Sequence, residues 1–339
     1  MGRFLAPPGQ QGIVSGGIFG PVTAIPSQIM VVGANGANPN TANTPFAAVR
    51  NNETSSWSVV STSTFGARGL LGVTHFGGSW YATTNAPGGI HAFVGSAADS
   101  ATPVFTATDT GQTDHLTDII GFTGTFFLIG TLNNQIIKAA LDLSSFVQAN
   151  ANGPGSYTTT GVHGSAGGPY ISVGLGSSAQ GICESANAIT WTLQVASFTT
   201  ASDNFVTSNT IIFDGTQWVA VGGSLVATST NATVWSVTSI AAATTTAQCI
   251  VFDQIDDIYY VGDRGGNVLV ATSVAGIATA TPQHISSAPN GLRCGASVNP
   301  VTLLGDSNGA VYITQDDGGS WTAENPGLGT VTLTGAAGH

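Results

Sequence analysis

The chain has 339 residues, of which 7% are charged and 42% are hydrophobic, and its net charge at pH 7 is −11. This composition excludes an intrinsically disordered chain, which combines low hydrophobicity with high charge. The negative charge and the absence of a basic cluster argue against nucleic acid or an anionic membrane surface as a partner. No apolar run reaches the roughly 18 residues that a membrane-spanning helix needs, and the N-terminus lacks the apolar core of a secretory signal peptide.

A short apolar run that ends in a small residue and a polar turn occurs seven times, at intervals of roughly 40 to 51 residues. The runs lie at residues 30–33, 80–84, 127–130, 171–174, 219–222, 259–262 and 303–305. A repeat of this length built from strand-like segments is typical of a β-propeller. We therefore predict an all-β fold: a seven-bladed propeller over residues 21–339, with four antiparallel strands in each blade and negligible helix.

In chain order, blade one is expected over residues 22–60, and blades two and three begin their inner strands near Leu70 and Asp118. Blade four spans residues 161–195. Blade five gives the clearest template, with strands at 210–213, 217–221, 225–228 and 234–237; its Asp214-Gly215 pair is a strong hairpin signal. Blade six runs from Cys249 to about residue 279 and blade seven over residues 293–321. Only residues 138–147 could hold a helical turn.

The ring must close, because an open ring would leave unpaired edge strands. Residues 330–335 read as one extra strand, which could supply the inner strand of blade one; residues 22–25 compete for that place. We expect both ends of the chain to meet in one blade. Residues 1–20 are rich in Gly, Pro and Gln and are predicted to form an extended N-terminal arm that anchors the protein in an assembly.

The sharpest motif lies in the last blade, where Thr314, Asp316, Gly318 and Trp321 fit the pattern Ser/Thr-x-Asp-x-Gly-x-Ser/Thr-Trp. An aspartate in this position can accept backbone N–H bonds within its own turn, while the glycine adopts a backbone shape that a side chain would disfavour. Partial copies end at three further tryptophans and lack the aspartate. We expect all these turns to be structural.

By this motif and its repeat, the chain resembles the Asp-box, or BNR-repeat, propellers, which include sialidases, sortilin-like receptors, a photosystem assembly factor and many phage tail or virion proteins. The repeat pattern covers nearly the whole chain, whereas the strict motif covers only blade seven. In that group, Asp boxes are structural and lie on the face away from active sites. The resemblance therefore implies a fold and leaves the activity open.

A sialidase is not expected. Sialidases use three arginines to hold the carboxylate of the substrate, a Tyr/Glu pair as the nucleophile and an aspartate as the acid. Here Arg3 falls in the arm and Arg50 near a turn on the wrong face, and the glutamates Glu53, Glu184 and Glu324 fall on no loop of an active face.

Other catalytic and metal-binding patterns are also missing from the sequence. The six histidines have no ligand spacing, and the three cysteines form no metal motif and are expected as buried free thiols. We interpret the three aspartates Asp253, Asp256 and Asp257 as part of a solvated turn, with a Ca²⁺ site as the alternative. We predict no catalytic residue, no cofactor and no metal.

The face opposite the Asp-box turn carries amide-rich loops that could bind sugar hydroxyls or a flat protein surface, although ordinary turn chemistry explains them as well. The candidate residues are Asn35, Asn38, Asn40, Asn43, Asn85, Asn133, Asn134, Asp263, Arg264, Asn267, Asp306 and Asn308. Together with the arm and the near absence of lysine, these features favour a non-enzymatic virion protein of a tailed phage. It would sit in the tail or tail tip and meet other virion proteins or a host surface glycan. A carbohydrate-binding lectin and a polysaccharide hydrolase are the alternatives.

Overall fold

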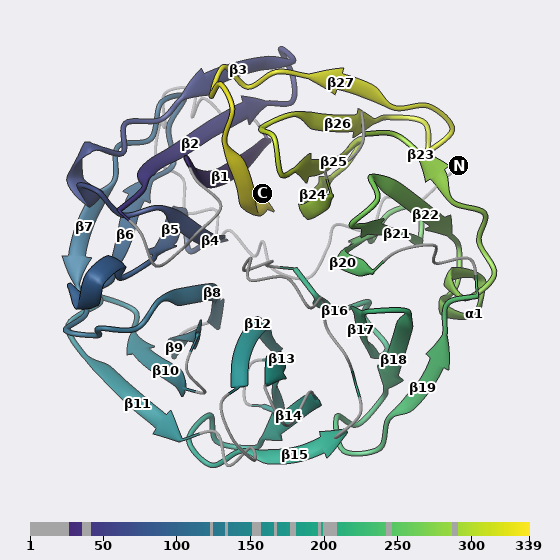
Figure 1. The fold of residues 1–339 in the computed structure, drawn as a ribbon, viewed down its shortest axis with the longest axis horizontal. Helices are drawn as coiled ribbons and strands as arrows, with labels where there is room; N and C mark the ends of the chain where they lie inside the picture. Colours follow the sequence, from purple (N-terminus) through teal and green to yellow (C-terminus); the bar gives the residue numbers. More distant parts are fainter. Residues whose placement is uncertain are drawn as a thin grey trace, which may run out of the picture.

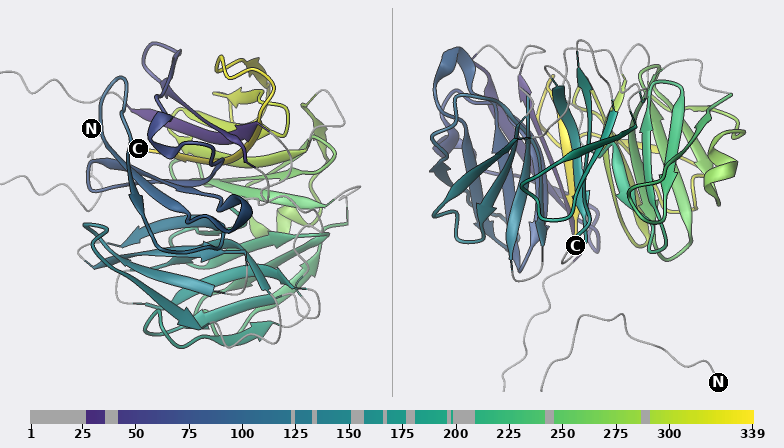
Figure 2. Two further views of the ribbon diagram at one scale, coloured as in Figure 1. Left: turned by 60° about the vertical axis from the view of Figure 1, so that its left-hand side comes forward. Right: turned by 90° about the horizontal axis from the view of Figure 1, so that it is seen from below.

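The structure is a computed structural model that describes residues 27–35, 42–122, 125–132, 135–150, 157–165, 168–176, 181–195, 198, 209–241, 246–286 and 291–339. Strands in these segments form seven antiparallel sheets of four strands each, arranged as blades around a central axis (Figure 1). The strands of each blade run between two opposite faces of the disc, as the side view in Figure 2 shows. The prediction of an all-β, seven-bladed propeller is confirmed.

Each blade is ordered from the axis outward. The first four blades are β28 (Thr332–Gly338), β1 (Gln28–Asn35), β2 (Thr44–Asn51), β3 (Ser56–Val59); β4 (Leu70–Phe76), β5 (Ser79–Thr84), β6 (Phe93–Ala98), β7 (Thr106–Asp109); β8 (Leu116–Phe122), β9 (Phe126–Thr131), β10 (Gln135–Ala140), β11 (Phe146–Asn150); and β12 (Tyr157–Gly164), β13 (Tyr170–Gly176), β14 (Gly181–Ser185), β15 (Thr192–Val195).

The last three blades are β16 (Ile211–Phe213), β17 (Trp218–Gly222), β18 (Leu225–Ser229), β19 (Ser236–Ser239); β20 (Ala247–Asp253), β21 (Ile258–Asp263), β22 (Asn267–Ala271), β23 (Gln283–His284); and β24 (Leu292–Val298), β25 (Val301–Asp306), β26 (Val311–Thr314), β27 (Thr322–Glu324). Blades two to seven follow the chain, whereas blade one takes its innermost strand from the C-terminal segment.

Closure occurs in blade one, where β28 pairs antiparallel with β1 and places Val31 opposite Ala336. The hydroxyl of Thr334 also donates to the carbonyl of Leu70, at 2.8 Å, which ties the closing strand to blade two. The two ends of the propeller therefore meet in one blade, and the C-terminal segment supplies the inner strand. The competing segment, residues 22–25, and the arm, residues 1–20, lie outside the described residues.

Blade six departs from the predicted pattern. A short helix, α1 (Val274–Ile277), follows β22, and the outer strand β23 has only two residues. Ser273 caps the helix by accepting a bond from the Gly276 N–H at 3.1 Å. Residues 138–147 hold no helix: they form the end of β10, a turn and the start of β11. Two 3-10 turns are the remaining elements of the described residues, η1 (Ser63–Phe65) and η2 (Pro87–Gly89).

Apolar clusters fill the spaces between neighbouring blades, and glycines on the second strands let the blades approach. A Cβ added to Gly262 would lie 2.8 Å from both Cys249 and Leu292, the latter in the next blade. Gly305 faces Cys294 in the same way. All three cysteines are buried free thiols, as predicted. In two of the repeated runs, close packing between blades thus explains why the run ends in a glycine.

Candidate functional site

The molecule has two faces. We call one of them the contact face: it carries the turns between the second and third strands of each blade, where the candidate binding loops are predicted. The face with the turns between third and fourth strands is the opposite face. Among the predicted contact residues, Asn35, Arg264 and Asn308 are exposed and Asn267 is half-buried. Asn38, Asn40, Asn133 and Asn134 lie outside the described residues.

Four predicted contact residues are buried instead: Asn43, Asn85, Asp263 and Asp306. Asp263 Oδ1 accepts bonds from the Gly265 and Asn267 N–H groups, both at 2.8 Å. Asp306 Oδ1 likewise accepts from Asn308 and Ala310, at 2.8 and 3.0 Å.

The second oxygen of Asp306 accepts from the hydroxyls of Ser286 and Tyr312, both at 3.2 Å. The hydrogen-bonding capacity of this carboxylate is therefore largely occupied by its own loop, by Tyr312 of β26 and by Ser286, which follows β23. Because its partners are internal, Asp306 holds the contact-face loop in shape and does not meet a ligand directly. Asp263 does the same for the loop between β21 and β22, since the Asn267 amide also donates to it at 2.9 Å.

On the opposite face, the turn between β26 and β27 has the bonding predicted for Asp316. Its Oδ1 accepts from the Ser320 N–H at 2.9 Å and from the Thr314 hydroxyl at 2.8 Å, and its Oδ2 accepts from the Ser320 hydroxyl at 2.6 Å. These donors hold the pKa of Asp316 at about 2. Gly318 has a φ of 80°, and Trp321 packs edge-on against Tyr260 of blade six.

The partial copies of this turn use asparagine in place of aspartate, which the sequence analysis missed. Asn231 Oδ1 accepts from the Thr233 and Val234 N–H groups, at 3.1 and 2.9 Å. Asn187 accepts from Ile189 and Thr190 in the same way, both at 2.9 Å. In both turns the residue after the asparagine is a buried alanine with positive φ. The spacing Asn-Ala-x-x-Trp, shared by blades four and five, is the signal that could have revealed this.

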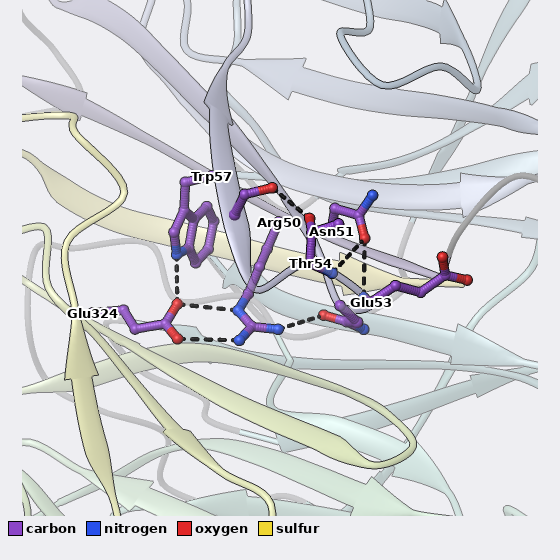
Figure 3. A network of polar contacts seen from close by, with 8 residues as sticks. Arg50, Asn51, Glu53, Thr54, Trp57 and Glu324 are labelled. Carbon is purple, nitrogen blue, oxygen red and sulfur yellow. Dashed lines mark hydrogen bonds and ion pairs between the residues drawn. The ribbon is translucent and has the colours of Figure 1, made fainter.

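A polar network on the opposite face joins blades one and seven (Figure 3). Arg50, at the end of β2, is buried, and its guanidinium donates twice to Glu324 of β27, at 3.0 and 3.1 Å. Trp57 donates to the same carboxylate at 2.6 Å, and Arg50 also donates to Asn52 at 2.9 Å. Arg50 therefore lies near a third-to-fourth-strand turn, as predicted, and closes the seam between the first and last blades.

The central channel of the ring contains a cavity of about 240 Å³, which is lined by the inner strands of all seven blades. Its described lining contains two titratable side chains, Asp118 on β8 and His163 on β12. Burial raises the pKa of Asp118 to about 7, although the N–H groups of Val162 and Ile119 donate to the carboxylate. Burial lowers the pKa of His163 to about 4. No second carboxyl is present among the described lining residues to form a catalytic pair with Asp118.

The rim of the disc consists of the seven outer strands β3, β7, β11, β15, β19, β23 and β27. Within these strands the charged residues are Asp109 and Glu324, and there is no Lys, Arg or Pro. Val59, Val147 and Val237 are 59%, 52% and 41% exposed on them. Edge strands of monomeric proteins are commonly protected by charges or proline. The rim lacks that protection along most of its length.

No protein-family profile and no curated protein sequence matches the chain. The fold is similar to solved structures of low sequence identity. A protein described as a candidate 6-phosphogluconolactonase from Bacteroides fragilis is 13% identical, with a TM-score of 0.64, over 94% of this chain and 100% of that one. YCF48 from Cyanidioschyzon merolae is 14% identical, with a TM-score of 0.55, over 77% and 86% of the two chains.

YCF48 bound to a D1 peptide is 15% identical to the chain, with a TM-score of 0.51, over 75% of this chain and 80% of that one. At sequence identities this low, the structural similarity establishes the propeller fold alone. In the described residues, no helix is long and apolar enough to cross a membrane.

Proposed function

We propose that this chain is a non-enzymatic structural component of a tailed-bacteriophage virion, in the tail or the tail tip. The observation that carries the proposal is the rim, whose outer strands hold only two charged residues and leave backbone groups and aliphatic side chains without the usual protection along most of their length. Such an edge is stable in a crowded assembly in which neighbouring proteins cover it. In this role the propeller acts as a rigid disc that packs against other virion proteins.

The carboxylates of the contact face support a binding or packing role over catalysis. The carboxylates of Asp263 and Asp306 are occupied by internal hydrogen bonds, which makes this face a shaped, nearly uncharged surface rather than a set of reactive groups. Asn35, Asn308 and Arg264 are exposed on this face and can meet a neighbouring protein or a host surface glycan. Amide and guanidinium groups can bond sugar hydroxyls or backbone carbonyls without needing a charged partner.

A hydrolase is the second candidate, favoured by one observation. Asp118 combines a channel position with a pKa near neutrality, which suits a general acid. Its two backbone donors and the lack of a second described carboxyl in the channel argue for a structural role instead. Hydrolysis of a surface polysaccharide that is abolished by Asp118→Asn would favour the enzyme.

The arm provides the test of the virion role. The encoding phage, with its own copy of the gene deleted, is grown in a host that supplies either the full chain or a chain without residues 1–20. We expect the truncated chain to fold as a soluble propeller, by circular dichroism, and to be absent from purified particles. Truncated chain at the full-length level in particles would contradict the anchoring role, and absence of both chains would contradict the virion role.

A further inference from the structure

Two histidines and an aspartate that are far apart in the sequence meet on the opposite face, beside the closing strand. His75 lies near the end of β4, Asp99 directly follows β6, and His339 directly follows β28. One ligand atom from each lies within 4.8 Å of the other two. The site therefore brings together blade two and the strand that closes blade one.

The distances fit a single small cation. His75 Nε2 lies 2.8 and 2.9 Å from the two Asp99 oxygens, and His339 Nε2 lies 3.8 Å from Asp99 Oδ1. Ligand atoms that surround one Zn²⁺ tetrahedrally at about 2.1 Å are about 3.4 Å apart. The observed separations bracket that value, so rotations that unstack the two imidazoles and turn their nitrogens toward Asp99 bring all three atoms onto one ion.

The backbone holds each ligand in place, and for His75 this is the pairing with Trp80 between β4 and β5. Asp99 N–H donates to Gly78 at 3.2 Å, within the turns of blade two. His339 exchanges two backbone hydrogen bonds with Gln28, at 3.0 and 3.2 Å, and the Gln28 amide donates to the Ser100 carbonyl at 3.1 Å. The ligands are thus fixed on paired strands and a tight turn, which reduces the entropy lost when a ligand binds.

The surroundings of the cluster are largely dry. The Asp99 side chain is 6% exposed, and the His75 and His339 side chains are 14% and 20% exposed. The two imidazoles stack with centroids 4.0 Å apart, and both meet the buried Trp80 ring edge-on. His339 Nε2 is buried and has no hydrogen-bond partner among the described residues. A buried imidazole nitrogen without a partner, aimed at a carboxylate, is a ready metal ligand.

We propose that His75, Asp99 and His339 form a binding site for a divalent first-row transition metal such as Zn²⁺. Two imidazoles and one carboxylate suit Zn²⁺, Co²⁺ or Ni²⁺, whereas Ca²⁺ and Mg²⁺ prefer oxygen ligands alone. Water completes the coordination. The bound ion links the closing strand β28 to blade two and so acts as a latch for the ring, in addition to the hydrogen bonds of blade one.

Calorimetric titration of the chelator-treated full chain with Zn²⁺ tests the site. We expect one ion per chain, with affinity in the micromolar range or tighter, a higher thermal midpoint that chelator reverses, and a visible absorption spectrum when Co²⁺ is used instead. His75→Gln, Asp99→Asn and His339→Gln should each weaken binding more than about tenfold. Circular dichroism checks that each variant folds; His339→Gln alters a residue outside the strands, directly after β28.

The matched control is His91→Gln. His91 and Asp109 form a similar pair in blade two, with an Nδ1–Oδ1 distance of 3.0 Å, but no second histidine adjoins them among the described residues. This variant should bind Zn²⁺ as the unaltered protein does. No binding at millimolar Zn²⁺, or binding that His339→Gln leaves unchanged, would overturn the proposal, because the site requires all three ligands.

Discussion

Arg50 and Glu324 form a two-bond ion pair across the seam where the ring closes, although they are 274 positions apart in the sequence. Arg50 is almost completely buried, while Glu324 is partly exposed. The pair belongs to blades one and seven, so it reinforces the contact that closure by β28 creates. Its carboxylate also accepts from Trp57.

Glu324→Ala leaves the buried Arg50 charge without its partner. We expect the free energy of unfolding to fall by roughly 3 kcal/mol, as for other buried pairs that lose one member. Urea denaturation followed by circular dichroism measures this. Glu53→Ala, a change at an exposed glutamate in the neighbouring turn, is the control and should have little effect. Replacing both members, by Arg50→Met with Glu324→Leu, should recover much of the loss; equal midpoints for Glu324→Ala and Glu53→Ala would contradict this account.

The hydrogen bonds of the asparagine turns predict how substitutions of Asn231 change the stability of the protein. Asn231→Ala removes the acceptor for two N–H groups and should lower the free energy of unfolding by roughly 1 to 2 kcal/mol. Asn231→Asp preserves the acceptor and should keep the thermal midpoint of the unaltered protein. A midpoint for Asn231→Ala equal to that of Asn231→Asp would show that the amide does not hold the turn.

The raised pKa of Asp118 predicts a pH dependence of stability. Since the folded pKa is about 7 and the ordinary value is 3.8, the folded protein keeps a proton that the unfolded chain loses between these two pH values. The Asp118 contribution to the free energy of unfolding therefore falls as pH rises from about 4 to 7, and then levels off. Each pKa unit corresponds to about 1.4 kcal/mol, which limits the fall to about 4 kcal/mol.

Asp118→Asn abolishes that titration and keeps an acceptor for Val162. The variant should be more stable than the unaltered protein at pH 8 and should lose this advantage toward pH 4. Denaturation curves at several pH values measure the difference, with Glu53→Gln as the control. An advantage that does not vary with pH would mean that Asp118 titrates normally in the folded protein.

The proposed virion role predicts that the rim is the surface that contacts neighbouring proteins. Val147→Lys combined with Val237→Lys places charge on two outer strands and should reduce incorporation into particles by about tenfold or more, with an unchanged thermal midpoint. Ile255→Lys is the matched control, because Ile255 is 71% exposed on the opposite face, away from the rim. Quantitative mass spectrometry of purified particles reads the outcome. Equal incorporation of both variants would exclude the rim as the packing surface.

Much of the fold was predictable because each blade repeats the same local pattern. The period, the Asp214-Gly215 hairpin and the C-terminal closing strand all follow from local signals that the structure bears out. The sequence gives no local sign of the register shifts near the start of several inner strands, as at Cys249 and Cys294, because a bulge depends on the strand packed beside it.

The candidate sites were less predictable, since they depend on residues that only closure brings together. His75, Asp99 and His339 show no ligand spacing in the sequence, and the seam pair Arg50 and Glu324 is equally distant. The buried state of Asp306 was missed for another reason: a turn with an aspartate looks the same in sequence whether its carboxylate faces solvent or the protein interior. The asparagine turns lack the aspartate that defines the motif, so the motif alone does not identify them.

The proposed virion role implies that a tailed phage encodes the chain, and electron cryo-microscopy of the particles of that phage tests the proposal most directly. The account predicts a seven-bladed disc in the tail or tail tip, with its rim against neighbouring proteins and its contact face toward a neighbour or the host. Particles whose density and protein content lack this chain, while the infected cell contains it in soluble form, would contradict the account.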